Sequence, residues 1–156
     1  MPDHGLAEDI AEEILYRTGR AMKDGDFDAF FECFEVPQIM ETLDGAKLVT
    51  TREGMRDTFF HVYRYYQDNG VVDLVRTVVN ARFLDEETIG STHVSRLLKA
   101  NGEPFRNPYP VYSVVKRIGG QWKVVSNSSA ILDAPDHNRA LLAGRDGSAP
   151  STVDEK

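Results

Sequence analysis

The sequence predicts an α+β domain in which helices cover one face of a curved antiparallel sheet. Two observations lead to this fold class. Stretches with apolar residues at helical spacing gather in residues 1–70, whereas residues 71–132 are rich in β-branched side chains and are divided by turn signals. A sheet that curls around helices leaves a conical cavity, which is a common kind of small-molecule site.

The first helix is expected over residues 6–23, because apolar residues recur there at helical spacing. These positions are Leu6, Ile10, Ile14, Ala21 and Met22. Gly25 is a natural stop, and Asp26 can cap a short second helix that Pro37 ends. The apolar stripe of the second helix consists of Phe27, Phe30, Phe31 and Phe34.

A β-hairpin and a long helix are expected next. The two strands and the turn of the hairpin are residues 38–43, residues 46–49 and Asp44-Gly45. Thr50 and Glu53 have the spacing of a capping box, which opens the long helix, and Asn69-Gly70 closes it. The apolar stripe of this helix consists of Met55, Phe59, Val62, Tyr63 and Tyr66.

Four long antiparallel strands follow. Their expected bounds are 71–84, 88–99, 109–118 and 122–132. The turns between them contain Asp85-Glu86-Glu87, Asn101-Gly102 and Gly119-Gly120-Gln121. A short terminal helix is expected within residues 133–144. We therefore predict one domain over residues 1–144 and a disordered tail over residues 145–156.

The composition is that of a soluble globular protein: 41% of the 156 residues are hydrophobic and 28% are charged. The net charge is −7 and no stretch concentrates lysine and arginine, so neither nucleic acid nor an anionic membrane is an expected partner. The N-terminus lacks the pattern of a secretory signal. A single cysteine, Cys33, precludes an intramolecular disulfide, and we expect a cytoplasmic location.

No metal or cofactor is expected. The four histidines are scattered along the chain without the spacing of a metal site. The sequence also lacks a glycine-rich phosphate loop and the nucleophile elbow of serine hydrolases.

Several short motifs together carry a resemblance to a known superfamily. They are Lys23-Asp24-Gly25-Asp26-Phe27-Asp28, the segment Phe30–Phe34, the capped helix that begins at Thr50, and Gly119-Gly120-Gln121-Trp122-Lys123-Val124. In order and spacing the chain resembles the nuclear-transport-factor-2-like superfamily, on its SnoaL-like side, over residues 6–132. The resemblance implies the cone-shaped fold. It does not imply one activity, because the superfamily contains isomerases, cyclases, dehydratases, epoxide hydrolases and proteins without catalysis.

The residues that serve two of these activities are mostly missing. The positions of the catalytic groups of the steroid isomerases correspond to Thr18, Thr42, Phe59 and Tyr112, with Glu41 beside Thr42. Three of these four positions lack the required chemistry, so that activity is not expected. The Asp-Arg-Asp group of the epoxide hydrolases is also missing, because residues 88–99 and 109–132 contain no carboxylate.

The same alignment assigns the two faces of the long strands. The side chains expected toward the cavity are Leu74, Arg76, Val78, Asn80, Ser91, His93, Ser95, Tyr112, Val114, Val125 and Asn127. Those expected on the outer face are Val75, Thr77, Val79, Val94, Ser113, Val115, Trp122 and Val124. Because the outer set is apolar, we expect a homodimer through this face. A shift of one residue would exchange the two faces.

His93 and Tyr112 are the candidate catalytic residues. A neutral imidazole can transfer a proton near physiological pH, and a tyrosine hydroxyl can donate to a developing oxyanion. The alternative is a structural histidine that is hydrogen-bonded to Ser91 or Ser95.

The candidate ligand-binding residues are Arg76, Asn127, Glu41, Asn80 and Ser95. Arg76 can pair with a carboxylate ligand, or it can lie at the sheet rim beside Asp73 or Glu41. Asn127 can orient a carbonyl or can be satisfied by neighbouring backbone. Glu41 can act as a base under apolar walls, or it can be an exposed hairpin residue.

Two functions remain open on these grounds. One is a cofactor-free isomerase, cyclase or dehydratase that acts on a hydrophobic substrate with a carbonyl or a carboxylate. The other is a non-catalytic ligand-binding or dimeric accessory module. The sequence favours a small-molecule-binding protein in either case.

Overall fold

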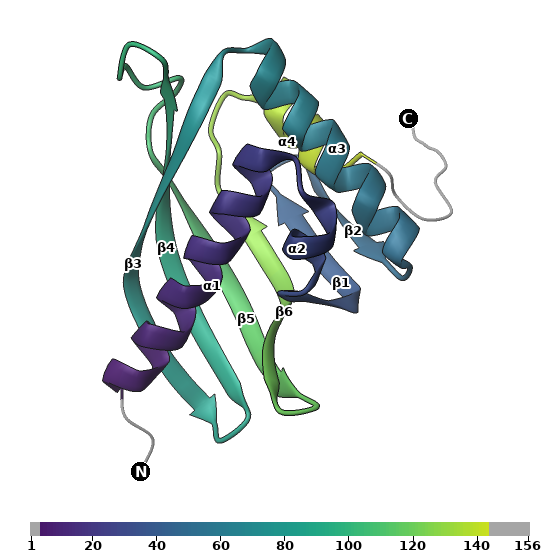
Figure 1. Ribbon diagram of the computed structural model, residues 1–156, viewed down its shortest axis with the longest axis vertical. Helices are drawn as coiled ribbons and strands as arrows, with labels where there is room; N and C mark the ends of the chain where they lie inside the picture. The colour runs from purple at the N-terminus through teal and green to yellow at the C-terminus, as the bar shows by residue number, and fades with distance from the viewer. Residues whose placement is uncertain (1–3, 144–156) are drawn as a thin grey trace.

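Four helices and one six-stranded sheet make up this computed structural model, which describes residues 4–143 (Figure 1). The helices are α1 (His4–Asp24), α2 (Phe27–Phe31), α3 (Arg52–Asp68) and α4 (Pro135–Leu141). The strands are β1 (Phe34–Thr42), β2 (Gly45–Val49), β3 (Val71–Asp85), β4 (Thr88–Lys99), β5 (Tyr109–Ile118) and β6 (Gln121–Ser129). The predicted α+β class and the order of its elements are confirmed. The predicted tail over residues 145–156 lies outside the described residues, as does residue 144.

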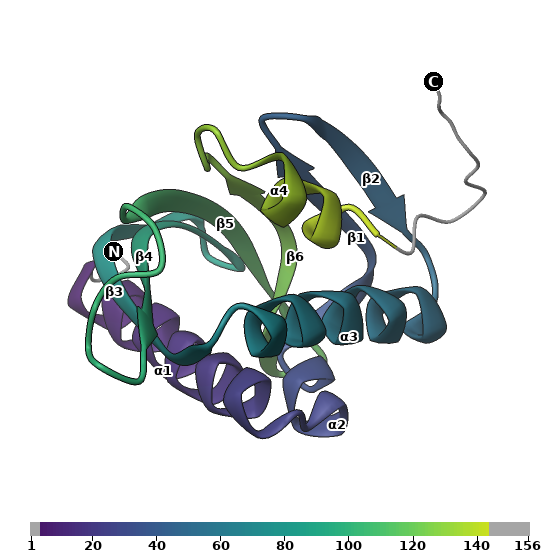
Figure 2. The same ribbon diagram turned by 90° about the horizontal axis from the view of Figure 1, so that it is seen from above.

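The strands are ordered β2-β1-β6-β5-β4-β3 in a single sheet. The four long strands pair antiparallel with one another in chain order, as predicted. The first hairpin joins the same sheet, and its strand β1 runs parallel to β6. This parallel pair is possible because β1 and β6 are far apart in the chain, which leaves a long connection between them. Figure 2 shows the sheet curling, with α1 and α3 along its open side.

Helix α1 places one of its faces against β3. The buried face carries Ala7, Ala11, Ile14 and Thr18, spaced three or four residues apart. Leu6, one of the apolar positions at helical spacing, is exposed, and its neighbour Ala7 faces the core instead. Within the described residues, no helix combines the length and the apolar character needed to cross a membrane.

Helices α2 and α3 begin at side-chain caps. The Asp26 carboxylate accepts a hydrogen bond from the Ala29 amide at 3.1 Å, so the predicted cap of α2 is confirmed. In α3 the capping residue is Thr51, whose Oγ1 accepts from the Gly54 amide at 3.0 Å. The predicted cap at Thr50 is therefore wrong by one residue. The cap forms at Thr51 because its extended backbone directs the side chain to the third amide of the helix.

An aromatic cluster joins α2 to α3. Phe59 contacts Phe27 edge-on and Phe30 at a tilt, with ring centroids 5.6 Å and 4.8 Å apart. Such pairs contribute about 0.5–1.5 kcal/mol beyond the burial of their area. Helix α2 ends at Phe31, and Phe34 is the first residue of β1. The predicted helical stripe is thus correct for Phe27, Phe30 and Phe31 only.

Two β-bulges decide which side chains face the helices. In β3 the register shifts between Val78 and Asn80, and in β6 it shifts between Val124 and Ser126. Each extra residue reverses the expected face of the residues that follow it, up to the next register shift. These shifts cannot be seen in a pattern of alternating side chains, because the alternation itself is interrupted.

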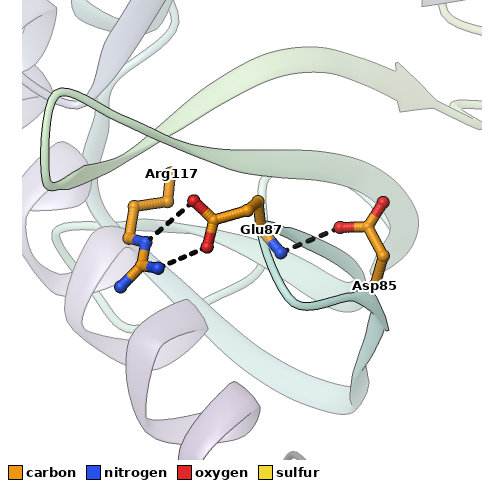
Figure 3. A network of polar contacts seen from close by, with 3 residues as sticks. All are labelled: Asp85, Glu87 and Arg117. Carbon is orange, nitrogen blue, oxygen red and sulfur yellow. Dashed lines mark hydrogen bonds and ion pairs between the residues drawn. The ribbon is translucent and has the colours of Figure 1, made fainter.

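An ion pair ties the β3–β4 turn to β5 (Figure 3). The Arg117 guanidinium pairs with the Glu87 carboxylate through two nitrogens, and the Arg117 amide donates to the Glu87 carbonyl at 2.9 Å. The Glu87 amide in turn donates to the Asp85 carboxylate at 2.8 Å. This hydrogen bond lowers the pKa of the Asp85 carboxyl group. Figure 1 shows that this turn and the long loop between β4 and β5 lie at opposite ends of the strands.

Candidate functional site

A cavity of about 150 Å³ lies between the concave face of the sheet and the helices. Its walls are mostly apolar, with Ile14 from α1, Met55, Phe59 and Val62 from α3, and Leu141 from α4. A cavity of this volume is the size of one benzene ring with some space around it. The polar side chains that interrupt the apolar walls come mainly from β3, β4, β5 and β6.

Strand β4 sends Ser91, His93 and Ser95 into the cavity, as expected for alternate residues of one strand. All three side chains are buried, and His93 is only 4% exposed. Across the sheet His93 lies between Val78 of β3 and Val111 of β5, so apolar side chains flank its ring. The inward orientation of His93 follows from this register.

The imidazole of His93 is neutral at physiological pH. Burial lowers its pKa to about 3, and the nearby positive charge of Arg76 contributes to the shift. No hydrogen bond from the ring to Ser91 or Ser95 is found within residues 4–143, although both serines share its face. A neutral ring with an available N–H can donate to an oxygen of a bound molecule. It is a weak base, because its pKa lies far below the working pH.

Arg76 enters the cavity from β3 and is held by α1. Its Nη2 donates to the Leu15 carbonyl at 2.7 Å and to the Thr18 hydroxyl at 2.6 Å. Thr18 in turn donates to the Ile14 carbonyl at 2.8 Å, which orients its oxygen toward Arg76. Burial lowers the pKa of the guanidinium, but Arg76 remains charged because its ordinary pKa is very high.

The alternative placement of Arg76 in an ion pair at the sheet rim is wrong. Asp73 pairs with Lys23 at 3.2 Å, and Glu41 is exposed on another strand. None of the ion pairs found within residues 4–143 includes Arg76.

Tyrosine hydroxyls form a second polar group at the same cavity. Tyr109 of β5 forms hydrogen bonds with Tyr66 of α3 and with Ser95 of β4. Burial raises the pKa of Tyr109, and the two hydrogen bonds offset only part of this effect. The Tyr66 hydroxyl lies 2.9 Å from Nε2 of His137 in α4. Burial raises the pKa of Tyr66, so both tyrosines keep their protons at physiological pH.

Tyr112 does not face the cavity, contrary to the sequence prediction. It pairs with Thr92, which lies between the inward residues Ser91 and His93, and its side chain is 44% exposed. Its hydroxyl lies against Gly90 on the outer face of the sheet. The expected register of β5 was wrong by one residue, and this exchanges its faces. Tyr112 and His93 therefore do not form a site.

The same error reverses other residues of β5 and β6. Ser113, Val115 and Val124 line the cavity, although they were expected outside. Trp122, also expected outside, lies beside α1 in a surface groove. Asn127 does reach the cavity, because the bulge in β6 restores its predicted face.

Two further candidates lie away from the cavity. Asn80 follows the β3 bulge, pairs with the outward residue Thr92 and is exposed. Glu41 is exposed because its neighbour Met40 faces inward. Of the seven candidate residues, the structure brings four to the cavity: Arg76, His93, Ser95 and Asn127.

Tyr109 is not among the site residues that the sequence predicts, and Tyr66 is predicted only as part of the apolar stripe of the long helix. The spacing of Tyr109 from Val111 and Ser113 was the available signal, because alternate residues of β5 share a face. Without the correct register this signal points to the wrong side of the sheet.

Solved structures with the same architecture place the fold among known ones. Aln2 from a Streptomyces species matches with a TM-score of 0.67 and 15% identity over 86% of this chain and 96% of that one. A Nostoc punctiforme protein with a cystatin-like fold matches with a TM-score of 0.65 and 14% identity over 86% and 97% of the two chains. A Novosphingobium aromaticivorans protein described as NTF2-like, with a cystatin-like fold, matches with a TM-score of 0.63 and 17% identity over 87% and 88%.

This chain has the nuclear-transport-factor-2-like fold. The expectation from its short motifs is thereby confirmed at the level of the fold. No protein-family model and no curated protein matches the sequence. Because the identities are low, the shared fold carries no activity from one protein to another. The function of this chain therefore has to follow from the residues of its own cavity.

Proposed function

We propose that the protein binds a small, mainly apolar molecule with one carbonyl or carboxylate group inside the cone. The observation that carries this proposal is the distribution of polar groups. Hydrogen-bond donors from Arg76, His93 and Tyr109 border a cavity whose other walls are largely apolar. Ligand sites commonly combine an apolar enclosure with a few placed polar groups that orient the ligand.

Binding is better supported than proton transfer by His93. A general base works best when its pKa is near the working pH, and the His93 pKa of about 3 is far below that range. A neutral imidazole is well suited to donate a hydrogen bond. His93 therefore acts as a binding group in this proposal.

A second candidate function is a cofactor-free isomerase, cyclase or dehydratase. One observation favours it: the neutral ring of His93 and the guanidinium of Arg76 are close enough for the charge of Arg76 to lower the pKa of His93. Donors arranged in this way can stabilise an oxyanion that develops on a bound carbonyl. Turnover of a screened substrate that disappears in His93→Ala would support this function, and unchanged turnover in that variant would exclude a catalytic role for His93.

The binding function can be tested with a screen of one-ring fragments by ligand-observed NMR. Ser113→Leu fills the cavity, so we expect it to weaken the binding of any fragment hit at least about tenfold, or 1.4 kcal/mol. Tyr112→Leu changes the adjacent residue on the outer face and is the matched control, expected to keep wild-type affinity. Equal affinity in Ser113→Leu and the wild type would show that the fragments bind elsewhere.

A further inference from the structure

One charged side chain lines this mostly apolar cavity. Among the described residues that line it, Arg76 is the one Asp, Glu, Lys or Arg side chain. The Arg76 side chain is partly buried. A charge that is withdrawn from water without a partner is costly, and proteins commonly compensate such a charge with an opposite one. No described carboxylate pairs with Arg76, so the compensating anion is not supplied by residues 4–143.

Helix α1 is shaped to hold this guanidinium. A Cβ atom built on Gly19 would lie 3.1 Å from Nη2 of Arg76, and 3.8 Å from Nε. A glycine in the middle of a helix costs about 0.5–1 kcal/mol relative to alanine. Here the absence of a side chain lets the guanidinium lie close against the helix backbone.

The hydrogen bonds of Arg76 leave part of its donor capacity unused. Its Nη2 bonds to the Leu15 carbonyl and to the Thr18 hydroxyl. No hydrogen bond from Nε or Nη1 is found within the part of the chain that the structure describes. A guanidinium fixed at one nitrogen by neutral oxygens keeps its full positive charge and can still bind a carboxylate with the remaining nitrogens.

We propose that the ligand is a small monocarboxylate, of about the size of one ring, whose carboxylate pairs with Arg76 in a cradle formed by Gly19 and Thr18. This inference rests on the proposed binding function and specifies its ligand class. The single positive charge of Arg76 favours a ligand with one negative charge. The apolar walls accept the hydrocarbon part, and the volume of about 150 Å³ limits its size. Ser95 and Tyr109 lie near enough to Arg76 to add neutral donors, because Ser95 pairs with Arg76 across the sheet and the charge of Arg76 acts on the Tyr109 hydroxyl.

Three probes that differ only in their polar end test the ligand class. They are benzoate, benzamide and benzyl alcohol, each titrated into the full chain by calorimetry or by ligand-observed NMR. We expect benzoate to bind at least about tenfold more tightly than either neutral probe, as for a charge-assisted pair that is removed from water.

Variants of the cradle test the residues. Arg76→Met is expected to abolish the preference for benzoate and to leave the benzamide affinity within about threefold. Arg82→Met, an exposed arginine of the same strand, is the matched control and should keep the preference. Gly19→Ala retains the charge but displaces the guanidinium, so it should weaken benzoate several-fold more than benzamide. Circular dichroism shows whether Arg76→Met folds. If it does not fold, Gly19→Ala tests the role of the Arg76 cradle in its place.

The outcomes separate this inference from the proposed function. If all three probes bind with equal affinity, the cavity binds small molecules but the inferred ligand class is wrong. If benzoate is preferred but Arg76→Met and Arg82→Met affect it equally, the assignment to Arg76 is wrong. If no probe binds and the wider fragment screen also yields no cavity ligand, both the binding function and the inference fail.

Discussion

His93 and His137 are both buried and both neutral in the native protein. Burial lowers each pKa to about 3, and a nearby arginine adds to each shift, Arg76 for His93 and Arg106 for His137. No carboxylate is among the groups that act on either pKa, so nothing offsets the effects of burial and of the arginine. Each histidine therefore resists protonation as long as the protein stays folded, whereas in the unfolded chain it takes up a proton at an ordinary pKa near 6.5.

The folding free energy should depend on pH through these two groups. Because the folded pKa is lower than the unfolded one, the stabilisation is complete above pH 6.5 and is lost as the pH falls toward 3. We expect each histidine to lower the free energy of unfolding by about 2–3 kcal/mol between pH 6.5 and about pH 4.5. Urea unfolding at both pH values measures this loss.

In His93→Gln the free energy of unfolding should fall less between these two pH values, by the contribution of one histidine. His61→Gln changes an exposed histidine of α3, serves as the control and is expected to keep the wild-type slope. If His93→Gln has the same slope as the wild type, the ring is already protonated or solvated in the native state.

Helix α4 is attached to the domain through the ring of His137. This ring is fully buried, stacks on Tyr65 with centroids 5.1 Å apart, and meets Tyr66 and Tyr109 edge-on. Its Nε2 is 2.9 Å from the Tyr66 hydroxyl, whereas its Nδ1 is buried and has no partner among the described residues. The hydrogen bond to Tyr66 thus links α4, which closes part of the cavity through Leu141, to α3.

Tyr66→Phe should weaken the attachment of α4. Both nitrogens of the buried His137 ring would then lack a partner, and an unsatisfied buried polar group costs about 1–3 kcal/mol. We expect chemical denaturation to show this loss of stability. We also expect amide hydrogen exchange to accelerate, relative to the wild type, more in α4 than in β4. Tyr112→Phe removes an exposed hydroxyl and should change neither. Exchange that accelerates equally in all elements would indicate global destabilisation instead.

The outer face of the sheet carries exposed apolar side chains across the whole molecule. Ile39 of β1, Leu48 of β2, Val75 of β3 and Tyr112 of β5 are each between 39% and 51% exposed. The register places Ile39 opposite Leu48, and Tyr112 near the middle of the sheet. Exposed apolar side chains on one face of a sheet favour an interface, so we propose that a second copy of the chain covers this face.

Light scattering on a sizing column at tens of micromolar protein tests this proposal. The wild type is expected at twice the mass of one chain, and Tyr112→Glu at the mass of one chain, because a charge at the middle of a buried apolar interface is costly. Leu132→Glu changes a more exposed leucine outside the sheet and should leave the dimer intact. A wild type that elutes as one chain would refute the proposal.

Much of the fold follows from local patterns. The order of the elements, the caps and turns, and the bounds of the long strands depend on residues close together in the chain, and the structure confirms them within one or two residues at most ends. The inward face of β4 was also predicted correctly, from the alignment with the superfamily that the chain resembles, and Ser91, His93 and Ser95 share this face because β4 alternates without interruption. The face of β5 could not, because Tyr112 and Tyr109 are equally plausible partners for a cavity until pairing with β4 selects one of them.

From the order of its residues alone, this chain could be assigned to the nuclear-transport-factor-2-like fold, with His93 and Arg76 as candidates for its cavity. The three-dimensional arrangement decided that Tyr109 lies inside and Tyr112 outside, and that Asn80 points to solvent. It also brought Gly19 and Thr18 of α1 against Arg76, a contact between positions about sixty residues apart. The physical reason is that periodicity sets the relative orientation of neighbours within a strand, whereas bulges and contacts between distant segments set which side of the sheet they occupy.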